Sequence, residues 1–269
     1  MIDRAHEFVE RVFALPGILD WRKRRFDHAF ADGYYGGVCR GIYASYEEAA
    51  AAAPKTLPLG YDNDGPARMY QDRLVRVFPS DYPMMFWLQK AFEEGARQVF
   101  DLGGHVGISY YAYQKHLPYP SDLSWRVCDV PAVVRSGLEL ARTRDEQHRL
   151  SFTEHFEEAD NADVLFTSGC VQYLPETLGQ RIASLRQRPR WVLVNLLPLH
   201  DQRAFWTVQS IGQAFCPYRI QRAETFFGEL TKLDYVVVDK WENLEKECDV
   251  AFERGFCLDR YFGAAMRLT

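Results

Sequence analysis

Apolar runs and helix-like stretches alternate along the chain from residue 96 onward. Each short apolar run ends at a polar or glycine-rich turn, and most are followed by apolar residues at helical spacing. This alternation predicts an α/β fold with a mostly parallel sheet, whose last two strands pair antiparallel. The runs expected to form strands are residues 99–101, 123–128, 150–152, 163–169, 191–196, 235–241 and 261–268.

The connections between these runs differ in length. Helices are expected from the end of the first turn through His116, from Pro175 to about Gln187, and over residues 224–233. Residues 197–222 make a longer connection than usual and carry Trp206, Phe215, Cys216-Pro-Tyr218 and several polar groups.

The first 95 residues lack this alternation and are predicted to be helices joined by irregular segments. Apolar residues fall at helical spacing over residues 2–13, Ser45 begins a capping box, and residues 84–94 form an apolar helix. No strand–turn–helix unit that could bind a nucleotide occurs there. We therefore expect a helical cap over residues 1–95, on the substrate side of a core that spans residues 96–269.

The most informative stretch is Asp101-Leu-Gly-Gly-His-Val-Gly107, which follows the first strand of the core. Gly103, Gly104 and Gly107 have no β-carbon, so the turn can be tight and a ligand can approach the backbone. The helix that opens near Gly107 would present unpaired N–H groups to an anionic group. A strand, a glycine turn and a helix in this order form the first crevice of a doubly wound sheet.

This turn has three interpretations: two as binding sites for different ligands and one as a turn that binds nothing. A dinucleotide fingerprint requires G-x-G-x-x-G, but His105 and Ile108 stand where the second and third glycines would be. The pattern D-x-G-G-x-x-G is similar instead to motif I of class I S-adenosylmethionine (SAM) methyltransferases. A tight turn that binds nothing is the third interpretation.

Two further strand ends carry polar groups. Asp129 ends the second strand of the core, where an acidic residue of a doubly wound fold holds ribose hydroxyls. Residues 168–173 follow the fourth strand and resemble the methyltransferase loop that lies beside the reacting methyl group.

The whole layout resembles class I SAM-dependent methyltransferases, and more narrowly a bacterial methyltransferase family defined largely from sequence. The resemblance covers residues 33–268 and implies a Rossmann-like, doubly wound sheet of seven strands, the last one antiparallel. It implies SAM as the cofactor and leaves the acceptor open. The shared features are Asp81-Tyr-Pro83, Phe100-Asp-Leu-Gly-Gly104, Trp125, Asp129-Val-Pro131, Ser168-Gly169, Gln172-Tyr-Leu174 and Pro217-Tyr-Arg219. The cofactor-binding residues that it implies are Asp101, Gly103, Gly104, His105, Gly107, Asp129, Val130, Ser168 and Gly169.

Methyl transfer from a sulfonium is an in-line displacement, in which the protein mainly positions the acceptor and excludes water. No metal is obligatory, and a base is needed only where a hydroxyl must lose a proton. His200 and Tyr173 are the candidate catalytic residues, with an ordinary loop histidine and a packed aromatic residue as the alternatives. Tyr82, Trp87 and Gln172 are expected to bind the substrate.

Further aromatic residues are interpreted either as the lining of a pocket beneath the cap or as part of the hydrophobic core. These residues are Tyr34, Tyr35, Tyr110, Tyr111 and Tyr113.

The composition of the chain limits the classes of molecule that it is expected to bind. The 269 residues are 47% hydrophobic and 26% charged, as in an ordinary soluble domain. The net charge of −5 argues against nucleic acid as the main partner, and the basic run at residues 22–25 is interpreted as a solvated helix face. No apolar run reaches the roughly 18 residues of a membrane span. The six cysteines lack metal-type spacing, so free thiols in a reducing cytoplasm are expected.

The function predicted is SAM-dependent methylation of a small-molecule acceptor in the cytoplasm. O-methylation is slightly favoured, because Thr167-Ser-Gly-Cys170 stands where N-methyltransferases carry [ND]-P-P-[YF]. A non-catalytic SAM-binding scaffold of a biosynthetic complex is the first alternative. A nicotinamide-dependent reductase is the second, and the displaced glycines count against it. A homodimer is left open.

Overall fold

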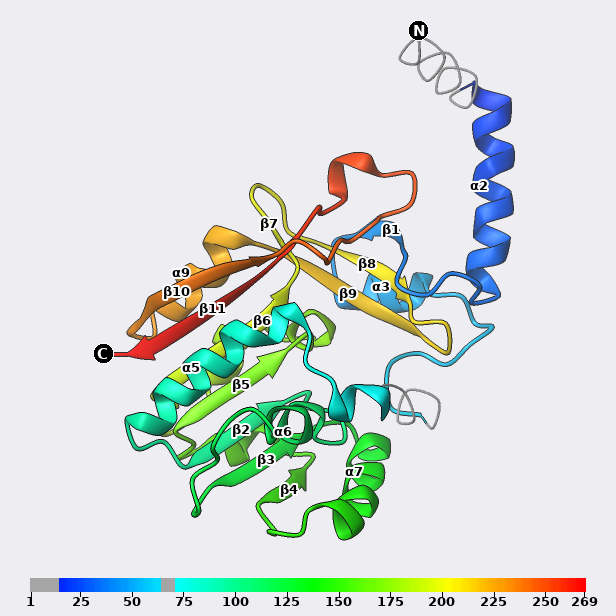
Figure 1. Cartoon of the computed structure of the whole chain (residues 1–269). Helices are drawn as coiled ribbons and strands as arrows, with labels where there is room; N and C mark the ends of the chain where they lie inside the picture. Colours follow the sequence, from blue (N-terminus) through cyan, green and yellow to red (C-terminus); the bar gives the residue numbers. More distant parts are fainter. Residues whose placement is uncertain (1–14, 64–70) are drawn as a thin grey trace, which may run out of the picture.

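A seven-stranded sheet forms the centre of the protein (Figure 1). The structure is a computed structural model that describes residues 15–63 and 71–269, so the helix expected over residues 2–13 lies outside the described residues. The strand order is β10-β11-β6-β5-β2-β3-β4, and β11 runs antiparallel to both of its neighbours while the remaining pairs are parallel. The strands are β2 (Gln98–Leu102), β3 (Ser124–Cys128), β4 (Leu150–Thr153), β5 (Val164–Ser168), β6 (Trp191–Leu197), β10 (Tyr235–Asn243) and β11 (Tyr261–Leu268).

The predicted Rossmann-like, doubly wound sheet is therefore confirmed. The chain runs outward from β2 to β3 and β4, and then returns to the other side of β2 to form β5 and β6. The strand order thus reverses between β2 and β5, and ligands of such folds bind beyond the carboxyl ends of the strands at that point.

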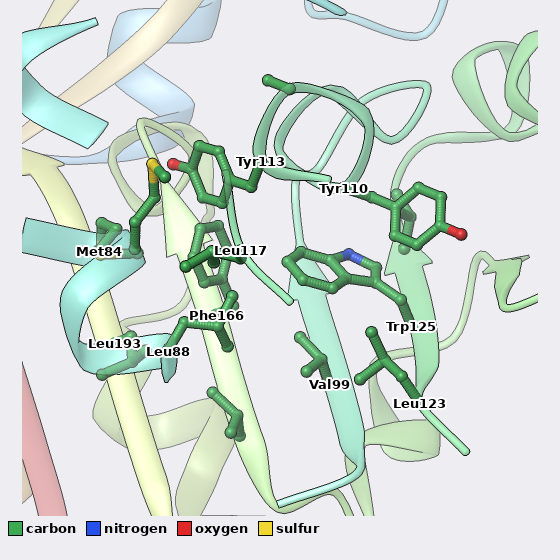
Figure 2. Packing of buried hydrophobic residues seen from close by; sticks show 14 of the residues in the cluster. Met84, Leu88, Val99, Tyr110, Tyr113, Leu117, Leu123, Trp125, Phe166 and Leu193 are labelled. Atoms are coloured by element: carbon green, nitrogen blue, oxygen red, sulfur yellow. The ribbon is translucent and has the colours of Figure 1, made fainter. Parts of the chain in front are cut away.

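Helices cover both faces of the sheet, which explains why β5 and β6 are continuous apolar runs. Leu165 of β5 packs into a cluster with the helices of one face, and the next residue, Phe166, packs into the cluster on the other face. Figure 2 shows this second cluster, where Met84 and Leu88 lie against Phe166 and Leu193. The helices are α5 (Tyr82–Glu93), α6 (Ile108–Tyr113) and α7 (Pro131–Arg144) on this face, and α8 (Leu178–Ala183) and α9 (Ala223–Thr231) on the other.

Two of these helices are shorter than their patterns predicted. The expected helix through His116 ends at Tyr113, where the amides of His116 and Leu117 close a turn on the Tyr113 carbonyl. The helix expected from Pro175 begins at Leu178, because Thr177 and Gln180 form a reciprocal capping box.

A second, four-stranded sheet was not predicted. Its order is β1-β8-β9-β7, and it pairs the N-terminal segment with the long connection at residues 197–222. Pro217 lies in β9 opposite Val208 of β8, at a point where β9 has no partner on its other side, so its missing N–H leaves no ladder bond unmade. The strands are β1 (Cys39–Tyr43), β7 (Leu199–His200), β8 (Phe205–Ser210) and β9 (Phe215–Arg222).

Outside β1, the described part of the N-terminal segment consists of helices joined by irregular stretches, as expected. Helix α2 (Pro16–Ala31) extends away from the body (Figure 1), and α3 (Tyr46–Ala52) is capped by the Ser45 hydroxyl, which accepts from the Glu48 amide. The 3₁₀ turns η1 (Gln71–Val75) and η2 (Pro79–Asp81) lead into α5. Within the described residues, every helix is too short or too polar to cross a membrane.

Candidate functional site

The turn after β2 is held tightly against the loop that follows β5. Gly103 has φ +74°, a left-handed conformation that favours glycine, and a β-carbon there would overlap Cβ and Sγ of Cys170. A β-carbon on Gly104 would overlap the Asp101 carboxylate. Gly107 has φ +88°, and its β-carbon would lie 2.8 Å from Leu150 Cδ2. The glycines are therefore required by packing within the protein itself.

The first amides of α6 differ from the expectation. The N–H groups of Gly107 and Ile108 donate to the Gly104 carbonyl, at 3.0 and 3.1 Å. These two amides are therefore already paired within the turn. The helix is also only six residues long.

Asp101 is buried beneath the turn, with 1% of its surface exposed. Burial raises the pKa of its carboxyl to about 7, and the nearby Asp129 charge adds to the rise, although the hydrogen bond from Trp125 Nε1 (3.1 Å) opposes it. A small cavity of about 60 Å³ lies here, and both acidic and basic side chains line it: Arg73, Arg76, Asp81 and Asp101.

Asp129 follows β3, and its carboxylate connects the glycine turn to the loop after β3 by hydrogen bonds. Its Oδ2 accepts from the His105 amide (3.0 Å), and its Oδ1 accepts from the Val130 amide (2.8 Å). Burial raises the pKa of this carboxyl, and the two amides and the nearby His105 counteract the rise. The carboxylate keeps lone pairs for further donors, because an ionised carboxylate can accept about four hydrogen bonds.

A cavity of about 880 Å³ opens at the carboxyl edge of the sheet. It adjoins the small cavity, since Gly103, His105 and Ser168 line both. The structure thus brings together most of the residues that the sequence singled out. Those lining the large cavity are Gly103, His105, Asp129, Val130, Ser168, Gly169, Gln172 and Tyr173.

The opposite wall of this cavity is aromatic. The Tyr173 ring lies edge-to-face against Tyr61 (5.0 Å between centroids) and Tyr218 (5.2 Å). The Tyr173 hydroxyl donates to Gln209 Oε1 (2.7 Å), and burial raises the pKa of Tyr173 well above its usual range. Tyr173 is therefore a neutral hydroxyl near pH 7.

Gln172 precedes Tyr173 in the loop after β5. It is 4% exposed and lines the large cavity. Its amide oxygen is shielded from water and has no hydrogen-bond partner among the residues that the structure describes.

Comparisons with known proteins give similar folds at low identity. No protein-family model matches the sequence, and no curated protein matches it. Among solved structures, the CcbJ methyltransferase from Streptomyces caelestis is 14% identical over 71% of this chain and 90% of its own, with a TM-score of 0.45. The mitomycin 7-O-methyltransferase MmcR is 18% identical over 96% of this chain and 70% of its own, with a TM-score of 0.46. The magnesium protoporphyrin IX methyltransferase from Synechocystis PCC 6803 is 10% identical over 69% and 77%, with a TM-score of 0.45. Similarities of this size carry no argument about function, and the fold assignment rests on the strand order.

His200 lies apart from this site. It belongs to β7 and lines another cavity, of about 1000 Å³, with Asp201, Glu242 and Asp259; this cavity shares Glu247 with the large one. Its Nδ1 accepts from the backbone amides of Gln202 (3.0 Å) and Arg203 (3.2 Å), so that lone pair is already engaged.

Tyr82 and Trp87 also lie outside both cavities at the glycine turn. Tyr82 is 62% exposed, whereas Trp87 donates from Nε1 to Asp239 Oδ2 (2.9 Å) and packs on Trp191. Most of the other aromatic residues also belong elsewhere. Tyr110, Tyr111 and Tyr113 are buried in the core cluster of Figure 2, and Tyr34 is exposed.

Sequence reasoning missed the residues that complete the aromatic wall. Tyr61 and Asp62 come from the loop before the undescribed segment, and Gln209 comes from β8. Asp62 Oδ1 accepts from the Ala132 amide (2.9 Å) and so fastens this loop to the first turn of α7. The glycine-flanked loop at residues 60–65 and the Pro217-Tyr-Arg219 motif were the available signals for this wall.

Proposed function

We propose that this chain is a SAM-dependent methyltransferase that acts on a small-molecule acceptor, with O-methylation slightly favoured. One observation carries the proposal. The glycine turn, Asp129 and the loop after β5 line a single cavity at the carboxyl edge of the sheet, beside the point where the strand order reverses.

The residues around the two cavities fit the cofactor. Asp129 has acceptor capacity left for the ribose hydroxyls, beyond the two amides that it already binds. The small cavity carries both signs of charge, which suits a zwitterionic amino-acid end: Asp81 and Asp101 for its ammonium, Arg73 and Arg76 for its carboxylate. When bound, the cofactor supplies an activated methyl group on a positively charged sulfur.

The chain's own residues then position the acceptor and exclude water. The Tyr173 hydroxyl, fixed on Gln209 and neutral, suits an orienting role rather than proton removal. We assign no base to His200, because it is not among the residues that line the two cavities at the glycine turn.

The N-terminal segment closes the acceptor side in this proposal. Gly60, Tyr61 and Asp62 line the large cavity, and Asp62 is fastened to the start of α7. This contact supports a cap over residues 1–95 that encloses the acceptor above the core of residues 96–269.

Calorimetry with S-adenosylhomocysteine, NAD and NADP tests the cofactor. We expect saturable binding of S-adenosylhomocysteine and little heat from either nicotinamide cofactor. The reverse preference would overturn the methyltransferase proposal in favour of the reductase. Binding of S-adenosylhomocysteine without consumption of labelled SAM in a small-molecule extract would favour the scaffold.

A further inference from the structure

Gln172 has an unmet hydrogen-bonding capacity in the wall of the large cavity. Its oxygen is shielded from water and has no partner among the described residues, and such a buried acceptor is unfavourable unless something donates to it. The side chain nevertheless lines the cavity, beside Gly169 of the loop after β5.

The neighbouring polar groups of this wall are paired, unlike Gln172. The Tyr173 hydroxyl donates to Gln209 Oε1 (2.7 Å), and Gln209 Nε2 donates to the Gly37 carbonyl (3.5 Å). The hydroxyls of Tyr218 and Tyr261 bond to each other (2.7 Å). These four groups are therefore satisfied within the protein, whereas the Gln172 oxygen, like Nε of Arg181 elsewhere in the cavity lining, has no partner among the described residues.

The shape of the wall restricts the ligand's chemistry. Tyr61, Tyr173 and Tyr218 line the cavity, and the Tyr173 ring packs edge-to-face on the other two. Aromatic walls of this kind favour a flat ring, packed edge-to-face or offset. The cavity, at about 880 Å³, is near the upper end of the roughly 300–1,000 Å³ range of ligand pockets.

We propose that Gln172 recognises the acceptor by accepting a hydrogen bond from an O–H or N–H group on a planar aromatic ring. This inference rests on the proposed function, because it places the acceptor beside the cofactor. It assigns specificity to Gln172 rather than to Tyr173, whose hydroxyl is already bonded.

A matched pair of probes tests the proposal on the full chain saturated with S-adenosylhomocysteine. The probes are 7-hydroxycoumarin, measured below neutral pH so that its hydroxyl keeps the proton, and 7-methoxycoumarin, which has the same ring without the donor. We expect the hydroxyl probe to bind about tenfold more tightly, as for a hydrogen bond to a buried acceptor. Comparable affinities, or no binding of either probe, would overturn the proposal.

Variants at Gln172 sharpen the test. Gln172→Met keeps the size and removes the acceptor, so the preference for the hydroxyl probe should disappear. Gln172→Glu keeps an acceptor oxygen, so the preference should persist or grow, and its loss would show that the amide nitrogen faces the ligand instead. Gln213→Leu, at an exposed glutamine on the turn between β8 and β9, should leave both affinities unchanged.

The result is separable from the proposed function. Failure of S-adenosylhomocysteine to bind the wild-type chain would count against the methyltransferase itself. Binding of S-adenosylhomocysteine with equal probe affinities would count against the role of Gln172 alone. Unchanged S-adenosylhomocysteine affinity in each Gln172 variant verifies that it has folded.

Discussion

The two walls of the large cavity are built in opposite ways. The cofactor-side wall comes mainly from one run of chain, from β2 to the start of α7, with the loop after β5 packed against it. The opposite wall joins a loop near residue 60 to β8 and β9, about 150 residues later in the chain, and Tyr173 at the far end of the loop after β5 belongs to this wall. The first wall is specified by local sequence and the second by long-range strand pairing.

The walls also differ in what fixes them. The cofactor-side wall is held by its backbone: glycines in left-handed conformations form the turn, and the Asp129 carboxylate bonds to two backbone amides. On the acceptor side, side chains hold one another, as in the contact between Tyr173 and Gln209. Substitutions in the first wall should therefore have larger effects than those in the second, which permits a ranked set of tests.

The largest effect is expected from Gly103→Ala. The new β-carbon would overlap Cys170, and the residue would be held at φ +74°. Overpacking of about 1–3 kcal/mol and backbone strain of about 1–3 kcal/mol together predict a loss of about 2–6 kcal/mol in the free energy of unfolding. Urea denaturation measures this, and S-adenosylhomocysteine binding should fall with it.

Gly228→Ala in α9 provides the control, because a β-carbon there meets nothing within 4 Å. That variant should match or exceed the wild-type stability by up to about 1 kcal/mol. Equal stability of the two variants would show that the turn accommodates the new β-carbon at little cost, against the prediction for the cofactor-side wall.

The second test uses pH. Burial raises the pKa of Asp101 to about 7, so the folded chain keeps this proton while the unfolded chain has released it. An acid whose pKa rises on folding destabilises the native state as pH rises from about 4 to about 7, and the effect is constant above that. The shift corresponds to an upper limit of about 4 kcal/mol.

Thermal melts from acidic to alkaline pH check this for the wild-type chain and Asp101→Asn. Asparagine can still accept from Trp125 but does not titrate, so the decline through this window should flatten in the variant. Parallel curves would mean that another group causes the decline. If the cofactor's ammonium pairs with Asp101, S-adenosylhomocysteine should also reduce the wild-type decline.

Local patterning predicted the main sheet because each of its strands is a short apolar run between turns. In β5 and β6 nearly every residue is buried, as expected for strands covered on both faces. The second sheet escaped prediction because β8 and β9 bury polar residues, among them Thr207, Gln209 and Arg219, which interrupt the apolar pattern. Its strand β1 pairs with a segment far away in the chain, which no local window can detect.

The same division applies to the candidate site. Gly103 and Asp129 could be predicted because strand ends meet at one edge of a parallel sheet. His200, a candidate catalytic residue that follows β6, lies elsewhere because β7 directs the chain into the second sheet, where His200 pairs with Arg222. Gln209 could not be predicted, because only the pairing of β8 with β1 and β9 brings it to Tyr173.

The third test is Asp129→Ala. If Asp129 holds both ribose hydroxyls, its removal should weaken S-adenosylhomocysteine binding by about 1.5–3 kcal/mol, the scale of hydrogen bonds to a charged group. Calorimetry measures the change. Asp122→Ala, at an exposed aspartate just before the same strand, should bind normally. Full affinity in a folded Asp129→Ala chain would assign the ribose to another residue.

The smallest effect is expected from Tyr173→Phe, which tests whether the two walls act separately. The substitution removes the hydrogen bond to Gln209 and the longer one accepted from the Tyr61 hydroxyl (3.4 Å), and it leaves the ring between Tyr61 and Tyr218, so the free energy of unfolding should fall by about 1 kcal/mol. The affinity for S-adenosylhomocysteine should stay within about twofold of wild type, because the lost bonds lie wholly on the acceptor side. Tyr218→Phe is the matched control for the loss of a tyrosine hydroxyl, since that hydroxyl also bonds to a neighbouring side chain, Tyr261. Combining Tyr173→Phe with Asp129→Ala completes the comparison: additive effects on cofactor affinity mean independent walls, whereas a coupling above about 0.5 kcal/mol would show that the loop after β5 transmits strain from one wall to the other.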